Sequence, residues 1–441
     1  MSTELYRQAL AEQLADSVQQ PLPSLTPRKI YSTVSLPGKA TAVVGMRRAG
    51  KTFFLHQLRL ERMQQGVPQH RLPCIHFEDE RLAGLQANQL DLLIEEYYRL
   101  FPELRGRETV TWCLDEIQAV PGWERFIRRL LDSEKVEIFL SGSSAALLSR
   151  EVATSMRGRG WEVIIYPFSF EEFLRYHNHQ VPAPSNRSGK VERSALEHDL
   201  LRFLETGGFP EAQLLSIADR HELLLRYVDV AMLRDVMERH RVSHTTGLRW
   251  LVRHLMANPG GLFSVEKFYA WMKSQGIAIS RDTLHALLGY LEDCFLVRWN
   301  WLETSAVRRR MVNPRKIYPV DTGLIPVFDR SGRPNRGHAL ETAVLIELER
   351  RRYQTAYVNT EEGFEVDFIA HRPGERSRLI QVSAEIDQQN IDREVRALLA
   401  AGAEHPRASL HLITLDPGRM VVPEAIRIHP AWQWFLESEM E

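Results

Sequence analysis

The stretch Gly45-Met46-Arg47-Arg48-Ala49-Gly50-Lys51-Thr52 decides the fold, because it has the pattern G-x-x-x-x-G-K-T of a phosphate-binding loop, or P-loop. An apolar run at 40–44 precedes it, as a buried strand would, and residues 53–58 follow it with helical periodicity. Glycines let the backbone wrap a phosphate, so that successive N–H groups and the positive end of a helix face the anion. This context disfavours the alternative, a glycine-rich turn that matches the pattern by chance.

The chemistry of each position in the loop predicts its role. We expect Lys51 to reach the β- and γ-phosphates of ATP, and the Thr52 hydroxyl to bind Mg²⁺. The residues predicted to contact the nucleotide are Gly45, Arg48, Ala49, Gly50, Lys51, Thr52 and Phe53.

A second motif supplies two carboxylates. The apolar strand 110–114 ends in Asp115 and Glu116, and a parallel sheet would place both acids at its carboxyl edge, which is the Walker B arrangement. Asp115 is predicted to hold Mg²⁺, mostly through water, and Glu116 to polarise the attacking water as the catalytic base. The alternative is a strand-end turn capped by Asp115, which the upstream P-loop disfavours.

A serine at the end of the next strand is a candidate catalytic residue. The strand 136–140 ends at Ser141, whose hydroxyl would touch both the γ-phosphate and the attacking water as a sensor. An ordinary helix cap is the open alternative, and Ser143 or Ser144 could also supply that cap for a helix at 145–149.

Two arginines follow that helix. Arg157 and Arg159 lie where an arginine could stabilise transition-state charge on the nucleotide of a neighbouring subunit, and Arg159 is the candidate catalytic residue. Solvated surface arginines are the equally open alternative.

The composition limits the classes of function. A chain of 441 residues predicts two to four domains, and a formal net charge of −1 means that any nucleic-acid contact must come from local patches. The three cysteines are scattered and the sixteen histidines show no H-E-x-x-H spacing, so no zinc site or disulfide framework is predicted. There is no apolar run of about eighteen residues and no signal-peptide pattern, so we expect a cytoplasmic protein without a membrane partner.

The order of elements predicts an α/β fold with several modules. An N-terminal helical segment is expected at 1–37, and a parallel-sheet P-loop core with strand–helix alternation at 38–166. A helical lid or linker is expected at 167–242, a winged helix at 243–312 and a second α/β domain at 313–441.

The winged helix is predicted from two short helices followed by a strand. The helices are expected at 263–272 and 281–293, the second in the recognition position, and the strand at 295–299. The basic cluster 308–310, with Arg315 and Lys316, lies in or just after the wing, where it could contact phosphates. A winged helix used only for packing between domains is the alternative.

The C-terminal segment resembles the layout of PD-(D/E)xK nucleases, in which a helix Glu, a strand Asp and a strand Glu hold Mg²⁺ and a nearby Lys activates water. Glu341 and Asp367 match this layout, whereas Gln381 stands where the second strand acid is expected and Ser383 where the Lys is expected. A Gln oxygen can still ligate a metal, but it brings no charge, and a Ser hydroxyl cannot replace an ammonium. Glu341, Asp367 and Gln381 are therefore candidate metal ligands of a nuclease-like domain that is expected to be inactive, unless a Lys or Arg from elsewhere in the chain replaces the missing one.

The whole set of motifs resembles a family of prokaryotic AAA-class ATPases that carry a further domain of unknown function. The resemblance implies an AAA-type ATPase followed by a winged helix and a restriction-endonuclease-like end. The segments that carry it are 45–52, 77–82, 114–118, 140–144, 167–174, 207–210, 234–236, 317–324 and 365–368.

These observations predict a Mg²⁺-dependent ATP hydrolase that acts on duplex or branched DNA as a homo-oligomer. An ATP-gated DNA nuclease is one alternative. A nucleotide-controlled switch that binds a protein partner, in defence or stress signalling, is the other.

Overall fold

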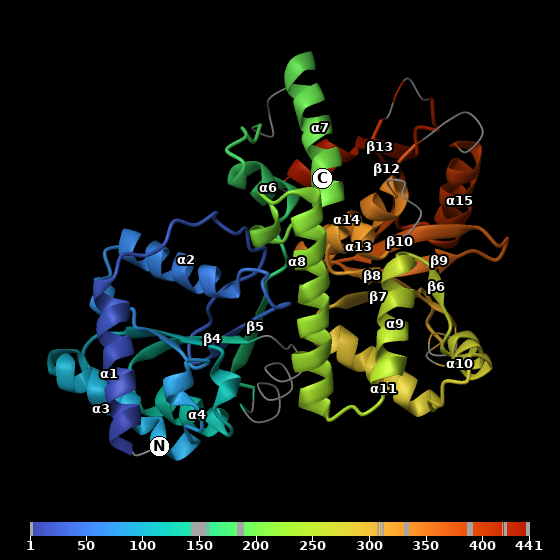
Figure 1. Ribbon diagram of the computed structural model, residues 1–441. Coiled ribbons are helices and arrows are strands. Elements are labelled where there is room, and N and C mark those ends of the chain that lie inside the picture. Colours follow the sequence, from blue (N-terminus) through green and yellow to red (C-terminus); the bar gives the residue numbers. More distant parts are fainter. Residues whose placement is uncertain are drawn as a thin grey trace. The chain divides into compact units, whose positions relative to one another are not determined.

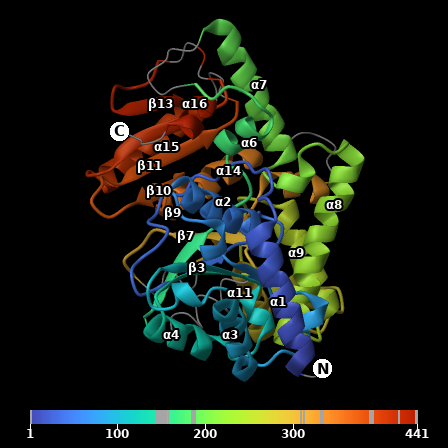
Figure 2. The ribbon, with the colours of Figure 1, turned by 90° about the vertical axis from the view of Figure 1, so that its left-hand side faces the viewer.

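A computed structural model describes residues 3–142, 156, 158–182, 189–306, 308, 310, 313–329, 335–385, 391–416, 418 and 421–437 of the chain (Figures 1 and 2). The chain forms two compact units, Met1–Ile165 and Tyr166–Glu441, which are described separately below. Ser143, Ser144, the expected helix 145–149, Arg157 and Arg309 lie outside the described residues. Within the described part of the chain, no helix combines the length and the apolar character needed to cross a membrane.

The first unit is built on a five-stranded sheet in which every strand pair is parallel. Its strand order is β2-β3-β4-β1-β5. Every residue of β1 and β3 is buried, as expected for strands covered on both faces by helices. The strands are β1 (Ala40–Val44), β2 (Cys74–His76), β3 (Val110–Asp115), β4 (Val136–Gly142) and β5 (Gly160–Ile164). The predicted parallel α/β architecture is therefore confirmed.

Helices of the first unit include α1 (Thr3–Gln19), α2 (Lys51–Gln64), α3 (Asp91–Leu100) and α4 (Trp123–Ser133). Helix α1 packs against α3 and β2 and buries Tyr6, Ala9, Leu10 and Leu14. The N-terminal helix is thus part of this compact unit, and burial of its apolar side chains stabilises it there.

The second unit begins with helices α6 (Phe170–Tyr176), α7 (Lys190–Thr206) and α8 (Ile217–Val230), and α8 continues into a π-helical segment, η7 (Ala231–Glu238).

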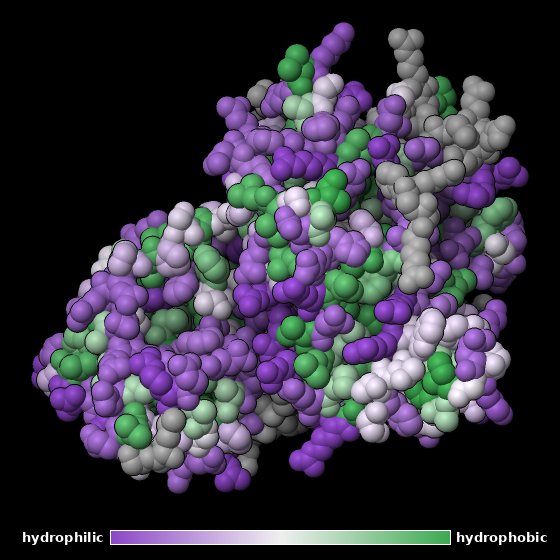
Figure 3. Space-filling view, in the orientation of Figure 1, coloured by the Kyte–Doolittle hydropathy of each residue, from purple (hydrophilic) through white to green (hydrophobic). Residues whose placement is uncertain are grey.

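Hydrophilic side chains predominate on the face drawn in Figure 3, and hydrophobic ones occur there in small, scattered groups.

One eight-stranded sheet runs through the rest of the second unit, in the order β13-β12-β11-β10-β9-β7-β8-β6. Strand β7 connects the two parts of this sheet, because it pairs antiparallel with β8 and parallel with β9. The sheet therefore contains strands from both of the predicted modules, 243–312 and 313–441. The strands are β6 (Leu262–Phe263), β7 (Val297–Leu302), β8 (Arg315–Pro319), β9 (Gln354–Asn359), β10 (Glu365–His371), β11 (Arg378–Ser383), β12 (Ser409–Thr414) and β13 (Ile426–Pro430).

Helices accompany both ends of this sheet. On the β6 side they are α9 (Thr245–Ala257), α10 (Val265–Ser274), α11 (Arg281–Asp293) and α13 (Ile325–Phe328), and on the β13 side α14 (Arg336–Arg350), α15 (Ile391–Glu404) and α16 (Ala431–Leu436). A large apolar core joins α6, α7, α14 and α16 to the sheet, with Trp434, Tyr318 and Phe368 among its fully buried side chains.

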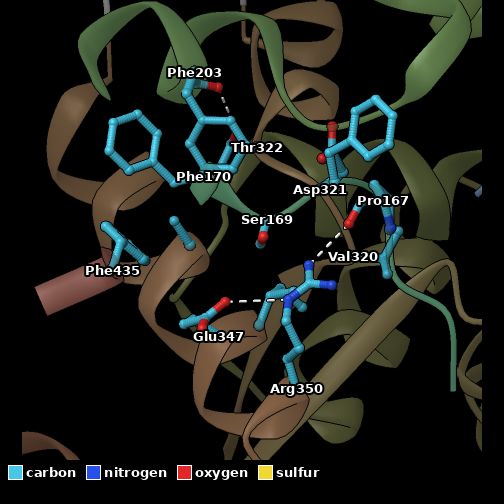
Figure 4. Close-up of a pocket in the computed structure, with 13 residues that line it drawn as sticks. Pro167, Ser169, Phe170, Phe203, Val320, Asp321, Thr322, Glu347, Arg350 and Phe435 are labelled. Atoms are coloured by element: carbon cyan, nitrogen blue, oxygen red, sulfur yellow. Dashed lines mark hydrogen bonds and ion pairs between the residues drawn. The ribbon is translucent and has the colours of Figure 1, made fainter. Parts of the chain in front are cut away.

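Three segments of the second unit that lie far apart in sequence meet at a buried aspartate (Figure 4). The Asp321 side chain accepts hydrogen bonds from the backbone N–H groups of Gly208 (2.6 Å) and Gly323 (3.0 Å). Phe168 N–H in turn donates to the carbonyl of Gly208 at 2.7 Å. A Cβ atom on Gly208 would lie 2.3 Å from the Phe168 carbonyl oxygen, so this junction requires glycine.

Burial raises the pKa of Asp321 to about 7, although its two backbone hydrogen bonds act in the opposite direction. On the neighbouring helix α14, the Arg350 side chain turns toward the same junction and donates to the Pro167 carbonyl (2.8 Å) and to Glu347 (3.1 Å), as Figure 4 shows. The motifs 167–174, 207–210 and 317–324 therefore have a structural role in this unit.

Candidate nucleotide site and a second polar pocket

The loop between β1 and α2 has positive φ angles at its two glycines. Gly45 has φ 149° and Gly50 has φ 102°, and a Cβ on Gly45 would lie 2.2 Å from the Ile165 carbonyl oxygen. Arg48, which is exposed, also has a positive φ of 66°. Ala49 is fully buried, and its N–H donates to the Met46 carbonyl at 3.2 Å.

The lysine of the loop lies inside the turn. Lys51 is 5% exposed, and its Nζ donates to the carbonyl oxygens of Gly45 and Met46, both at 3.2 Å. These carbonyls belong to the loop that is expected to surround the phosphates. The loop thus holds the ammonium through two carbonyl oxygens. A bound phosphate could take their place as the hydrogen-bond acceptor of Lys51.

The predicted metal ligands from the two motifs lie side by side. Thr52 Oγ1 donates to Asp115 Oδ2 at 2.9 Å, and Ser141 Oγ donates to the other oxygen of Asp115. Asp115 is 1% exposed and Ser141 is fully buried. Burial alone would raise the pKa of Asp115, but hydrogen bonds from His76, Ser141 and Thr52 outweigh it and lower that pKa below its usual value.

The second acid follows directly. Glu116 has a left-handed backbone (φ 54°), and its N–H donates to Ser141 Oγ at 3.0 Å. Ser141 therefore links the backbone of Glu116 to the carboxylate of Asp115, which fixes the two acids relative to each other. Gln118 donates a hydrogen bond to the Glu116 carboxylate.

Two residues at this site are absent from the sequence-based prediction. His76 ends β2 in register with Asp115, and its Nδ1 lies 3.1 Å from Asp115 Oδ2, a contact that raises the pKa of His76. The sequence predicts a strand at 71–77, and parallel-strand ends meet at one sheet edge, so the position of His76 near the end of that strand was a usable signal. Arg28 supports the loop by donating to the Ala49 carbonyl at 2.9 Å, and we find no sequence signal for that contact.

The remaining predicted residues lie at the surface of this unit. Phe53 is 51% exposed on α2, with its ring edge-on to His56. Arg159 forms an ion pair with Asp132, and its side chain is 42% exposed. Nucleotide contact by Phe53 and action on a neighbouring subunit by Arg159 stay predictions.

A second polar site lies in the other unit, where α14, β10 and β11 line a pocket of about 730 Å³. Glu341 and Asp367 face each other across the side chain of Lys316 from β8. Lys316 Nζ lies 3.1 Å from Glu341 Oε1 and 2.8 Å from Asp367 Oδ1, and it also lies 2.8 Å from Glu365 Oε1. Burial lowers the pKa of Lys316, but the three carboxylates outweigh it and raise that pKa well above the usual value.

The predicted third ligand is engaged by protein groups. Gln381 Oε1 accepts from the Asp367 N–H at 3.3 Å, and its Nε2 donates to Glu394 Oε2 at 2.6 Å. Ser383 Oγ donates to the Glu385 carbonyl at 3.1 Å. The structure thus brings Glu341, Asp367 and Gln381 to one pocket, and their assignment as metal ligands stays a prediction.

Comparison with known proteins supports the class predicted for the first site. Residues 37–174 match the sequence profile of a family described as an AAA domain, and residues 197–332 match a domain of unknown function (DUF8612). The uncharacterized protein MJ1544 of Methanocaldococcus jannaschii is 32% identical over 413 residues, which cover 91% of this chain and 89% of that protein. An uncharacterized protein of Haemophilus influenzae is 30% identical over 353 residues, which cover 80% of this chain and 84% of that protein.

Solved structures resemble the chain more distantly. The Walker-type ATPase PABY2304 of Pyrococcus abyssi has 17% identity and a TM-score of 0.39, with 73% of this chain and 95% of that chain covered. The ORC1 protein of Aeropyrum pernix, solved in complex with DNA, has 15% identity and a TM-score of 0.28, with 74% and 91% covered. At these TM-scores we draw no conclusion from either likeness.

The chain belongs to the family of the M. jannaschii protein MJ1544. Within it, the prediction of an AAA-class P-loop domain is confirmed at the level of the family. The winged helix and the nuclease-like layout stay predictions.

Proposed function

We propose that this member of the family is a Mg²⁺-dependent ATP hydrolase that binds and remodels DNA as a homo-oligomer. The observation that carries the first part is the constellation at the carboxyl edge of the parallel sheet. There Lys51, Thr52 and Asp115 lie together, and Ser141 fixes Asp115 against Glu116.

The residues present fit both ATP and Mg²⁺. A Cβ on Gly45 would meet the Ile165 carbonyl oxygen, so glycine there lets the loop pack closely against the chain after β5. The N-terminus of α2 follows the loop and offers backbone N–H groups to a phosphate. Thr52 and Asp115 offer hard oxygen donors 2.9 Å apart, the kind that Mg²⁺ prefers. Bound Mg²⁺ would offset the charge of the phosphate oxygens.

Each side chain then has one task in the proposed reaction. Lys51 holds the oxygens of the β- and γ-phosphates and offsets charge that develops in the transition state. Glu116 accepts a hydrogen bond from the attacking water and so orients it toward the γ-phosphate. Ser141 keeps Glu116 and Asp115 in position through its two hydrogen bonds.

Replacing Lys51 tests the nucleotide site. We expect Lys51→Ala to weaken binding of a non-hydrolysable ATP analogue about 10- to 100-fold in calorimetry with Mg²⁺, since a charge-assisted hydrogen bond contributes about 1.5–3 kcal/mol. The matched control is Lys135→Ala, an exposed lysine of the same unit that donates to the Arg107 carbonyl. Unchanged affinity in Lys51→Ala, or no binding heat with the wild type, would contradict the proposed site.

The DNA part rests on the helices and strands around residues 245–319. The order α9, β6, α10, α11, β7, β8, with β8 between β6 and β7 in an antiparallel sheet, is the order of a winged helix. The guanidinium of Arg315 lies over the rings of Trp299 (4.6 Å) and Trp301 (4.4 Å), and that of Arg310 lies 5.9 Å from the Trp301 ring. Trp299 is buried, Arg315 and Trp301 are partly exposed, and Arg310 is exposed. The exposed part of this group combines cationic and aromatic side chains, which suits contacts to phosphates and bases.

Charge reversal at the cluster tests DNA binding. We expect fluorescent duplex DNA to bind with strong salt dependence, and Arg308→Glu with Arg310→Glu to weaken it about tenfold or more and to lower the salt slope by about 2. Reversal of two exposed helix arginines, Arg193→Glu with Arg226→Glu, is the matched control. Absence of salt-dependent binding would contradict the DNA proposal and favour a nucleotide-controlled switch on a protein partner.

A further inference from the structure

Three acids that line the second polar pocket share one buried lysine. The Lys316 side chain is 4% exposed, and its ammonium contacts Glu341 of α14 together with Glu365 and Asp367 of β10. An ammonium has three N–H donors. Two of them donate hydrogen bonds to Glu341 and Asp367, and the carboxylate of Glu365 adds an ion pair at 2.8 Å.

Several of the oxygens that would hold a metal accept hydrogen bonds from other groups as well. Glu341 Oε1 accepts from the Tyr318 hydroxyl at 2.7 Å, and Asp367 Oδ2 accepts from the Val382 N–H at 3.0 Å. The Gln381 oxygen accepts from a backbone N–H of β10. Each acid is thus positioned for hydrogen bonds, with donors at 2.7–3.1 Å.

The coordination geometry of Mg²⁺ differs from this arrangement of hydrogen bonds. It needs oxygens at about 2.0–2.1 Å in a nearly octahedral shell. In the described residues, no group of three or more His, Cys, Asp or Glu side chains is arranged to hold a metal ion. A divalent cation between Glu341 and Asp367 would also lie beside the buried ammonium, which repels it strongly where water is excluded. The pocket as folded therefore does not fit the metal that its nuclease-like layout implies.

We propose that the ammonium of Lys316 is the resident cation of this pocket, in the place that the nuclease layout reserves for Mg²⁺, and that the pocket takes up no divalent cation while Lys316 is present. Without a metal, the pocket lacks the means to activate water on a phosphodiester. This inference concerns the second unit alone and is independent of ATP hydrolysis.

Iron-directed backbone cleavage tests the proposal on the full chain without nucleotide. Fe²⁺ with ascorbate and peroxide cleaves a backbone only close to a bound ion, so the fragments locate each metal site. In the wild type we expect no cleavage near Glu341 or Asp367. In Lys316→Met we expect cleavage at both, because three carboxylates are left without their cation. Electron paramagnetic resonance of Mn²⁺ should show one more bound ion per chain in this variant than in the wild type. The pocket of the variant should bind Mn²⁺ at least about 100-fold more tightly than the wild-type pocket.

Two further variants assign the new signal. Lys316→Met combined with Asp367→Asn should lose the added cleavage, and Lys273→Met, at an exposed lysine of the same unit, should behave as the wild type. Wild-type cleavage near Glu341 and Asp367 would overturn the proposal and favour a nuclease in which Lys316 assists a metal. A folded Lys316→Met variant that gains no metal would overturn it too. If that variant does not fold, the wild-type cleavage pattern decides alone.

Discussion

Glu116→Gln should lower the rate of ATP hydrolysis on the order of 100-fold or more while nucleotide affinity stays within a few-fold of the wild type. The amide keeps the size of the carboxylate, and its oxygen can still accept the hydrogen bond that Gln118 donates. It is neutral, so it orients and polarises the attacking water poorly, and general-base catalysis of this kind contributes about 10²–10⁴-fold.

The structure explains why this effect should be confined to the chemical step. The Glu116 backbone has φ 54° and is held through its N–H by Ser141, an interaction that the substitution leaves in place. Phosphate release assays give the rate, and calorimetry with a non-hydrolysable analogue gives the affinity. Glu103→Gln, at an exposed carboxylate of the same unit, is the control. Hydrolysis at the wild-type rate in Glu116→Gln, with nucleotide still bound, would show that another group serves as the base.

The nucleotide site could be predicted from sequence because its determinants are local. The buried strand 40–44, the glycines of the loop and the acids after residue 114 lie within short stretches, and a parallel sheet brings strand ends to one edge whatever its strand order. Predicting the contact of His76 with Asp115 also requires the strand order and register, because it depends on β2 and β3 being neighbours in register. Arg28 reaches the loop from an irregular segment, and periodicity carries no information there.

The second pocket could be predicted only in part from local sequence patterns. Helix α14 and strands β10 and β11 were predictable from their patterns, and so was the meeting of Glu341 and Asp367. The contact of both acids with Lys316 was not predictable. Lys316 belongs to β8, and the position of β8 depends on its pairing with β7 and on the parallel pairing of β7 with β9. These pairings join segments distant in sequence, and no spacing rule connects position 316 with position 367.

The free energy of unfolding of the second unit should fall as pH rises from about 4 to about 7, and Asp321 should be a main cause. Burial raises the pKa of this carboxyl from 3.8 to about 7 in the folded chain. The folded state therefore binds the proton more tightly than the unfolded state does. Stability from the protonated form is fully present below about pH 4, is lost as pH rises through about 7, and changes no further above that. Each unit of pKa difference corresponds to about 1.4 kcal/mol, which sets an upper value of about 4 kcal/mol for this group.

Asp321→Asn isolates that contribution, because an amide does not titrate in this range. Urea unfolding of both proteins at several pH values should show the wild-type advantage shrinking between pH 4 and 7. The variant should also be less stable at every pH, since one of the N–H groups of Gly208 and Gly323 would face an amide NH₂ instead of an acceptor oxygen. Asp282→Asn, at an exposed carboxylate of the same unit, should keep the wild-type slope. Equal slopes in wild type and Asp321→Asn would mean that the junction of the three segments holds an ordinary carboxylate, and that its hydrogen bonds to the glycine backbone outweigh its burial.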